Sequence, residues 1–134
     1  MNELQGMRML VVDDDADNAE LLALVLGRAG AAVEICHTAT GALEIALARP
    51  LDAVLFDVGL PDMHGIELFT RLRQIPQNAS TVGFAVTGRA RDELPKLGEL
   101  GLGYARKPID SSSLIGDLLS CLSERRAAQP GGQG

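Results

Sequence analysis

The stretch MRMLVVDDD, residues 7–15, is an apolar run with a single arginine that ends directly in three aspartates. Such a run is typical of a strand that is covered by helices on both faces. The aspartates then fall at the carboxyl end of the strand, which is where parallel α/β sheets bind their ligands. This stretch therefore predicts a buried parallel sheet with a polar site at one edge.

Strand-like and helix-like segments alternate five times along the chain. The other expected strands are residues 32–36, 53–56, 81–86 and 103–105. Apolar residues at helical spacing mark helices in between, namely Leu22, Val25, Leu26 and Ala29, then Leu43, Ala46 and Leu47, then Ile66, Phe69 and Leu72, and finally Leu114, Ile115, Leu118, Leu119 and Leu122. Because crossovers between parallel strands are right-handed, this alternation predicts an α/β fold with a doubly wound (βα)₅ parallel sheet in the strand order 2-1-3-4-5.

Two segments have distinctive patterns. In residues 32–36, Val33 and Ile35 flank Glu34, which favours an edge strand with one wetter face. Between the fourth and fifth strands, Pro95 and Gly98 disfavour a long helix, so a short one starting near Asp92 or Glu93 is expected.

Length and composition limit the classes of function. The 134 residues suit one domain, which we place at residues 1–126, with residues 127–134 (AAQPGGQG) as a disordered tail or linker stub. A formal net charge of −6 disfavours direct binding to nucleic acid. No run is long enough to span a membrane and no signal peptide is evident, so a soluble cytoplasmic protein is expected. Cys36 and Cys121 lack CxxC spacing and are interpreted as idle thiols rather than a disulfide or zinc site.

Polar residues follow four of the five expected strands. Asp13 and Asp14 follow the first, Asp57 the third, Thr87 the fourth and Lys107 the fifth. The carboxylates are hard oxygen ligands suited to Mg²⁺, with Mn²⁺ as the alternative ion. A lysine and a hydroxyl beside them suit a phosphoryl group, because its transfer spreads negative charge over oxygen atoms. The pattern predicts that Asp57 is a nucleophile that forms an acyl phosphate.

Over residues 7–125 the chain resembles the receiver domains of response regulators, which have a flavodoxin-like fold. Four motifs carry the resemblance, namely LVVDDD (10–15), LFDVGLPDMHG (55–65), VTG (86–88) and RKP (106–108). The resemblance implies a Mg²⁺ site at Asp13, Asp14, Asp57 and the Gly59 carbonyl, with Asp57 as phosphoacceptor. Thr87 and Lys107 would hold the phosphoryl oxygens.

The same resemblance implies a switch and its partners. Thr87 and the aromatic residue Tyr104 would move on phosphorylation and change the face formed by the fourth and fifth helices and the fifth strand. The Lys107–Pro108 peptide bond is commonly cis in this family. The phosphodonor would be a histidine kinase or histidine phosphotransfer protein of a two-component system or phosphorelay, the output would be a downstream protein target, and a homodimer on phosphorylation is left open.

Three features depart from the family pattern or vary within it. Lys107 follows Thr87 by 20 residues, a shorter segment than this family usually has. His64 stands where an acidic residue or its amide is common, and a solvent-exposed turn residue is expected there. Gly59 and Arg89 occupy variable positions that tune water access in this family.

Other functions stay open from the sequence. A phosphorylation-independent binding module would keep the fold without the chemistry, although this chain retains every acidic residue and the lysine. A hydrolase of the aspartyl-phosphatase type, suggested by Asp13-x-Asp15, needs a cap for which there is little room. Nucleotide-binding glycine motifs are absent. We therefore expect catalysis limited to the domain's own aspartyl phosphorylation and dephosphorylation, without separate turnover.

Overall fold

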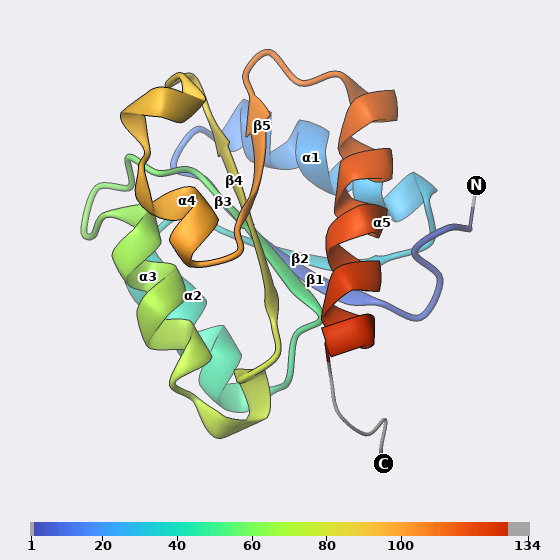
Figure 1. Ribbon diagram of the computed structural model, residues 1–134, viewed down its shortest axis with the longest axis horizontal. Helices are drawn as coiled ribbons and strands as arrows, with labels where there is room; N and C mark the ends of the chain where they lie inside the picture. Colours follow the sequence, from blue (N-terminus) through green and yellow to red (C-terminus); the bar gives the residue numbers. More distant parts are fainter. Residues whose placement is uncertain (1, 129–134) are drawn as a thin grey trace.

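Five parallel strands form one sheet in the order β2-β1-β3-β4-β5 (Figure 1). The computed structural model describes residues 2–128, with side chains to residue 125. The strands are β1 (Arg8–Val12), β2 (Ala32–Cys36), β3 (Ala53–Phe56), β4 (Val82–Thr87) and β5 (Gly103–Arg106). The predicted α/β fold and strand order are confirmed.

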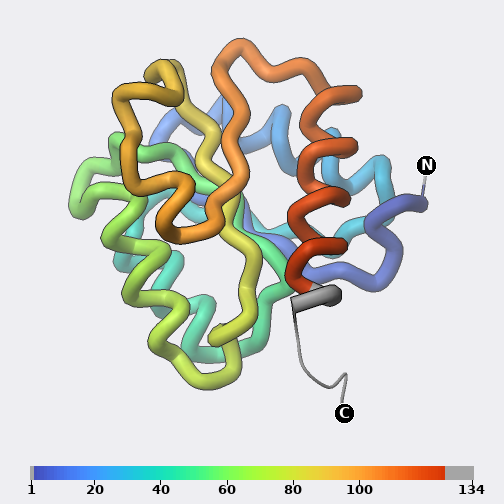
Figure 2. Tube along the Cα trace, viewed as in Figure 1, coloured from blue at the N-terminus to red at the C-terminus, as the bar shows by residue number. Residues whose placement is uncertain are grey.

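Helices cover both faces of the sheet (Figures 1 and 2). They are α1 (Ala16–Arg28), α2 (Ala39–Ala48), α3 (Gly65–Arg73), α4 (Lys96–Glu99) and α5 (Ser111–Ala128), with 3₁₀ turns η1 (Pro76–Asn78) and η2 (Arg91–Glu93). One core layer joins the sheet to α1 and α5, and the other joins it to α2, α3 and α4. Within the described residues, no helix has the length and hydropathy that crossing a bilayer requires.

The register of the central strands aligns their carboxyl ends. Val12 pairs with Phe56, and Phe56 pairs with Ala85 on the next strand. All residues of β3 and β4 are buried, because helices pack on both of their faces. The residues that follow β1 and β3 therefore emerge side by side at one edge of the sheet.

Helix α1 starts and ends at residues that favour a helix start and a helix end. The Asp15 carboxylate accepts hydrogen bonds from the N–H groups of Asp17 and Asn18, which otherwise lack partners in the first turn. The chain leaves the helix through Gly30, whose φ of +105° few other residues adopt. The cap at Asp15 fixes the start of α1 directly after Asp13 and Asp14.

Two packing predictions are wrong in detail. Helix α2 buries Ala39, Ala42 and Ala46, whereas Leu47 is 66% exposed. Small residues let α2 pack closely on the sheet, and Leu47 lies about 100° around the helix from Ala46, where it is exposed. In the edge strand β2, Ile35 is 36% exposed. Glu34 is instead partly covered, because its carboxylate forms an ion pair with Arg49 at 3.3 Å.

The segment between β4 and β5 has a short helix, as predicted, but the expected start near Asp92 or Glu93 is wrong. Residues 91–93 form the 3₁₀ turn η2, and α4 begins only at Lys96. Leu94 separates the two with ψ of 70°. It precedes Pro95, whose ring disfavours the helical conformation of the residue before it.

The chain end differs slightly from expectation. Helix α5 runs to Ala128, two residues into the stretch predicted as a tail, and residues 129–134 lie outside the described residues.

The two cysteines are free and partly buried. Cys36 packs against the layer of α2, α3 and α4, whereas Cys121 packs against the layer of α1 and α5, so the sheet lies between them. Burial raises the pKa of the Cys36 thiol to about 11, which keeps it protonated at neutral pH. The interpretation as idle thiols fits this placement.

Gly65 lets the loop after β3 fold closely onto its own strand. Its N–H donates to the Val58 carbonyl at 2.8 Å, and a Cβ atom at this position would lie 2.5 Å from the Asp57 carbonyl oxygen. No other residue fits this approach without a shift of the backbone that carries Asp57.

We predict that Gly65→Ala lowers the free energy of unfolding by about 2 kcal/mol or more, because the added methyl overpacks the start of α3. Gly116→Ala in α5 is the matched control. A Cβ there meets nothing within 4 Å, so this change should raise stability by up to about 1 kcal/mol. Urea unfolding of both variants measures the difference, and equal effects would contradict the packing described.

Candidate functional site

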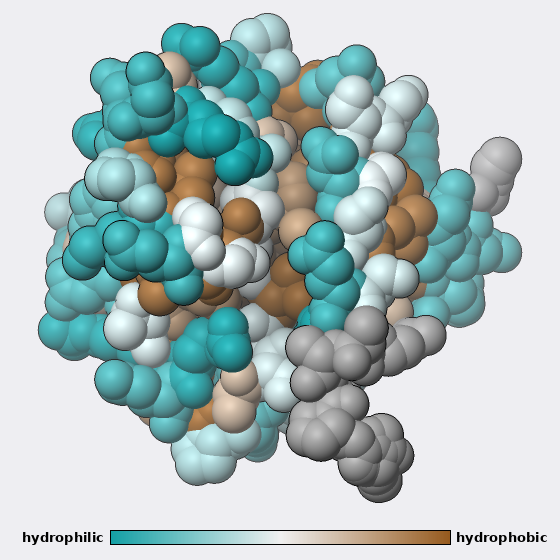
Figure 3. Space-filling view, in the orientation of Figure 1, coloured by the Kyte–Doolittle hydropathy of each residue, from teal (hydrophilic) through white to brown (hydrophobic). Residues whose placement is uncertain are grey.

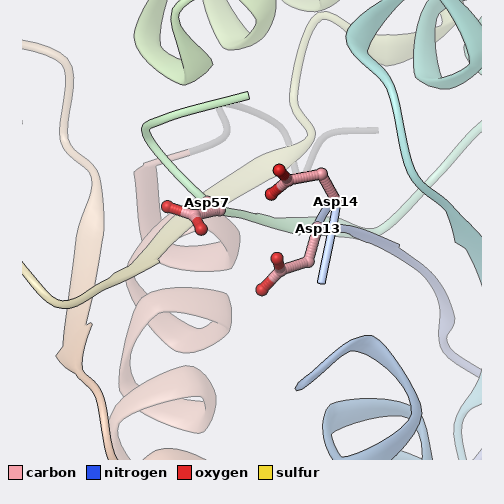
Figure 4. A group of neighbouring side chains, drawn as sticks. All are labelled: Asp13, Asp14 and Asp57. Atoms are coloured by element: carbon pink, nitrogen blue, oxygen red, sulfur yellow. The ribbon is translucent and has the colours of Figure 1, made fainter. Parts of the chain in front are cut away.

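Three carboxylates meet at the carboxyl edge of the sheet (Figure 4). Asp13 and Asp14 follow β1, and Asp57 follows β3. Each offers one oxygen atom within 4.8 Å of those of the other two. The structure thus brings together the three carboxylates that the sequence placed at the strand ends.

Asp13 is the buried member of this group, with a side chain 1% exposed. One of its carboxylate oxygens accepts a hydrogen bond from the Asp15 N–H at 2.9 Å. His37 Nδ1 lies 2.9 Å from the Asp13 carbonyl oxygen, a contact between the segments that follow β1 and β2 that the sequence analysis missed. A buried carboxylate is costly unless it is paired, so the fixed position of Asp13 requires a cation nearby.

Lys107 supplies that cation. Its Nζ lies 3.0 Å from a carboxylate oxygen of Asp13 and 3.0 Å from one of Asp57. The residue follows β5 and precedes the cis peptide bond to Pro108. Partial burial alone would lower the pKa of the Lys107 ammonium, but hydrogen bonds and charge from Asp13 and Asp57 outweigh it, and the pKa is raised. The lysine is therefore firmly charged at neutral pH.

Thr87 lies at the end of β4, one strand away from Asp57. The residue is buried, and its hydroxyl oxygen accepts a hydrogen bond from the Arg89 N–H at 3.2 Å. Its carbonyl accepts from the Lys107 N–H at 2.9 Å, which joins the ends of β4 and β5. Thr87 thus borders the acidic group, while its hydroxyl is engaged within its own loop.

Tyr104 on β5 contacts the loop that follows Thr87. Its hydroxyl donates a hydrogen bond to the Arg89 carbonyl, and the Arg91 guanidinium lies 5.0 Å from the ring centroid. Arg106 adds a bond from its Nε to the Gly88 carbonyl at 3.2 Å. Side chains from β5 therefore fix the segment that follows Thr87. The sequence analysis did not predict this role for Arg106.

The loop after Asp57 is ordered by two local contacts. The Gly59 N–H donates to Asp57 Oδ1 at 3.2 Å. His64 precedes α3, and its Nδ1 accepts from the Ile66 N–H at 3.2 Å. The exposed position expected for His64 is confirmed, and its ring also caps the helix.

Asp62 in the same loop makes a connection that the sequence analysis missed. Its carboxylate accepts three hydrogen bonds at the start of α2, from the N–H groups of Ala39 and Thr40 at 2.9 Å each and from the Thr40 hydroxyl at 2.7 Å. The N–H and hydroxyl of Thr40, with the N–H of Ala39, lower the pKa of Asp62 to about 2. The bonds tie the loop that carries Asp57 and Gly59 to a helix distant in sequence.

The donor set fits a divalent cation with hard-ligand preference. Carboxylate oxygens suit Mg²⁺ and Mn²⁺, and the exposed side of the group at Asp14 leaves room for the water ligands that Mg²⁺ usually keeps. No thiol or imidazole belongs to the group, which disfavours zinc. The arrangement can hold a cation beside a carboxylate that also contacts an ammonium.

The chain is similar to known proteins over most of its length. A family model described as response regulator receiver domain matches residues 9–118. An uncharacterised 14.6 kDa protein of Leptolyngbya boryana is 39% identical over 119 residues, which are 86% of this chain and 89% of that protein. The signal transduction histidine-protein kinase BarA of Escherichia coli is 34% identical over 85% of this chain, but the chain spans only 13% of the kinase.

Solved structures show the same fold. A receiver domain of Methylobacillus flagellatus is 33% identical with a TM-score of 0.78, and the match covers 86% of this chain and 98% of that one. A receiver domain protein of Methanospirillum hungatei is 28% identical with a TM-score of 0.82, covering 92% and 98% of the two chains.

We predict that Asp62→Asn destabilises the domain in a pH-dependent way. Because the folded-state pKa of Asp62 falls from 3.8 to about 2, its contribution is present above about pH 4 and is lost as the pH falls toward 2. The stability difference between wild type and variant should shrink over that range in urea unfolding. Asp117→Asn, at an exposed aspartate with no recorded hydrogen bond in the described chain, is the control. A pH-independent difference for Asp62→Asn would count against the contact.

Proposed function

The chain belongs to the response regulator receiver domains of two-component signalling, and on that premise we propose that it accepts a phosphoryl group on Asp57. The observation that carries the proposal is the position of Lys107, whose ammonium lies 3.0 Å from both Asp57 and Asp13. A cation bound to the nucleophile and to a neighbouring carboxylate can offset the charge that phosphoryl transfer brings to this point.

A divalent cation would complete the site. Asp13, Asp14 and Asp57 would hold Mg²⁺, or Mn²⁺ in its place, together with the Gly59 carbonyl. When bound, the cation supplies positive charge beside the phosphoryl oxygens. The bond from the Gly59 N–H to Asp57 Oδ1 and the tie from Asp62 to α2 keep the loop in place for this role.

The reaction needs few groups from the protein. The Asp57 carboxylate attacks phosphorus to form an acyl phosphate, and the bond from phosphorus to the donor breaks with its electron pair leaving on the donor. Lys107 and the Thr87 hydroxyl would bind the phosphoryl oxygens. Attack by water on phosphorus breaks the bond to the Asp57 oxygen and returns the carboxylate and inorganic phosphate, so phosphorylation and dephosphorylation are both reactions of the domain itself.

Thr87 and Tyr104 would form the switch. A bond from the Thr87 hydroxyl to the phosphoryl group draws Thr87 toward Asp57 and moves the loop to which Arg89 belongs. Tyr104 then loses the carbonyl partner that it has on Arg89. The result is a population shift of the face formed by α4, β5 and α5, which is the proposed output surface.

The partners follow from this chemistry. A histidine kinase or histidine phosphotransfer protein would supply the phosphoryl group, in line with the similarity to part of a signal transduction histidine-protein kinase. A downstream protein would read the α4-β5-α5 face in the cytoplasm, and phosphorylation would drive any homodimer. Residues 1–126 would act as the functional unit, with residues 127–134 as a tail or linker.

We predict that incubation with acetyl phosphate and Mg²⁺ adds one phosphoryl mass to the wild-type protein and that Asp57→Asn abolishes the addition. Intact-mass spectrometry and peptide mapping measure the amount and the site. Omission of Mg²⁺ should also prevent it. No added mass on the wild type would instead indicate a binding module that acts without phosphorylation.

We further predict that Lys107→Ala slows phosphorylation about a hundredfold at saturating Mg²⁺, because the variant lacks a charge aimed at the transferring group. Lys96→Ala removes an exposed lysine on α4 and is the matched control, with an unchanged rate. Phosphorylation is followed over time by mass spectrometry. Equal rates for both variants would remove Lys107 from the proposed mechanism.

A further inference from the structure

A groove of about 740 Å³ lies between α3 and the segment from η2 to α4. One wall is formed by His64, Ile66, Glu67 and Thr70, and the other by residues 93–96, 99 and 100. Figure 3 shows apolar side chains in hollows on this side of the molecule, surrounded by polar ones. The groove is separate from the acidic group, to which none of its lining residues belongs.

One wall of the groove is formed by the short helix α4 and the 3₁₀ turn before it. Helix α4 begins at Lys96, directly after Pro95, and ends at Glu99, so one helical turn and a 3₁₀ turn line the groove opposite the first part of α3. The apolar part of the lining comes from Ile66, Leu94, Pro95 and Leu100. Ile66 and Leu94 reach the surface only at their edges, so the apolar floor is narrow and suits one or two inserted side chains.

The rim of the groove is acidic. Glu67, Glu93 and Glu99 line it, against a single lysine, Lys96. Glu67 is ion-paired with Arg71 at 2.7 Å, and Glu93 accepts a hydrogen bond from the Ala90 N–H at 2.8 Å, which leaves its charge in place. Neither Glu93 nor Glu99 has a recorded ion pair in the described residues.

We propose that this groove docks a short basic amphipathic segment of a partner protein. One or two apolar side chains of the segment would enter the floor beside Ile66 and Leu94, and lysine or arginine side chains would contact Glu93 and Glu99 on the rim. An anionic membrane surface or a nucleic acid is disfavoured as the occupant, because the rim carries the same sign of charge. The docking does not require phosphorylation, so it can be tested apart from the function proposed above.

Both walls of the groove continue directly into loops of the acidic site. Helix α3 begins at the end of the loop that starts with Asp57, and Gly65 is bonded back to Val58. On the other side, η2 follows the loop from Thr87 that Tyr104 and Arg106 fix. A segment bound in the groove therefore contacts both the fixed wall at α3 and the segment from η2 to α4, which would move with Thr87, and docking and phosphorylation would influence each other reciprocally.

The test is a titration of the unphosphorylated ¹⁵N-labelled protein with a short helical Leu/Lys peptide, followed by amide chemical shifts. We expect the largest shifts in residues 64–70 and 93–100. The same peptide with glutamate in place of lysine should not bind. Shifts centred elsewhere, or none at millimolar peptide, would overturn the proposal.

Charge variants separate docking in the groove from attraction to an acidic protein in general. Glu93→Gln keeps the acceptor for the Ala90 N–H, and combined with Glu99→Lys it should weaken binding about tenfold. The control combines Glu20→Gln with Glu44→Lys, on exposed positions of α1 and α2 with the same change in net charge. Binding weakened equally in both double variants would contradict a specific site at the groove.

Discussion

The close approach of like charges at one edge of the sheet is the main physical constraint on this structure. Asp13, Asp14 and Asp57 place carboxylate oxygens within 4.8 Å of one another, and Lys107 contacts two of these residues from the end of β5. The carboxylates repel one another because parallel strands in register end at one edge of the sheet and bring their terminal side chains together. The same alignment places Lys107 beside them, and its positive charge offsets part of this repulsion. The balance is incomplete, with three negative charges against one positive charge, and the site therefore favours a further cation.

The two sides of this site are held differently. On the side of Asp57, the loop is closed by the tight approach at Gly65 and by three hydrogen bonds from Asp62 to the start of α2. On the side of Thr87, the loop depends on side chains of β5 that reach backbone carbonyls, from Tyr104 and Arg106. These two hydrogen bonds are exposed, and a Cβ atom added at Gly88 in this loop would meet nothing within 4 Å, so the loop lacks the close backbone packing found at Gly65. We infer that the Asp57 side stays in place while the Thr87 side moves, which suits the proposed switch.

Much of the fold, and most of the residues that form the site, can be predicted from the sequence for a physical reason. Buried parallel strands need continuous apolar runs, and the polar residues that end these runs, such as Asp13 and Asp57, must lie at one edge. Contacts that depend on side-chain direction are not visible in this way. Nothing in the sequence links Asp62 to Thr40, and the periodicity of α2 does not show that alanines rather than Leu47 face the sheet. Helix α4 starts later than predicted because the ring of Pro95 disfavours the helical conformation at Leu94.

The dependence of stability on Mg²⁺ tests the central claim most directly. If the carboxylates form one cation site in the folded state, the free energy of unfolding should rise with Mg²⁺ concentration as expected for a ligand that binds only the folded protein. Asp13→Asn should abolish most of this rise. Asp15→Asn, at the neighbouring residue that caps α1, should retain it, because asparagine caps helices as well as aspartate does. A Mg²⁺ response of equal size in both variants, or none in the wild type, would contradict the account.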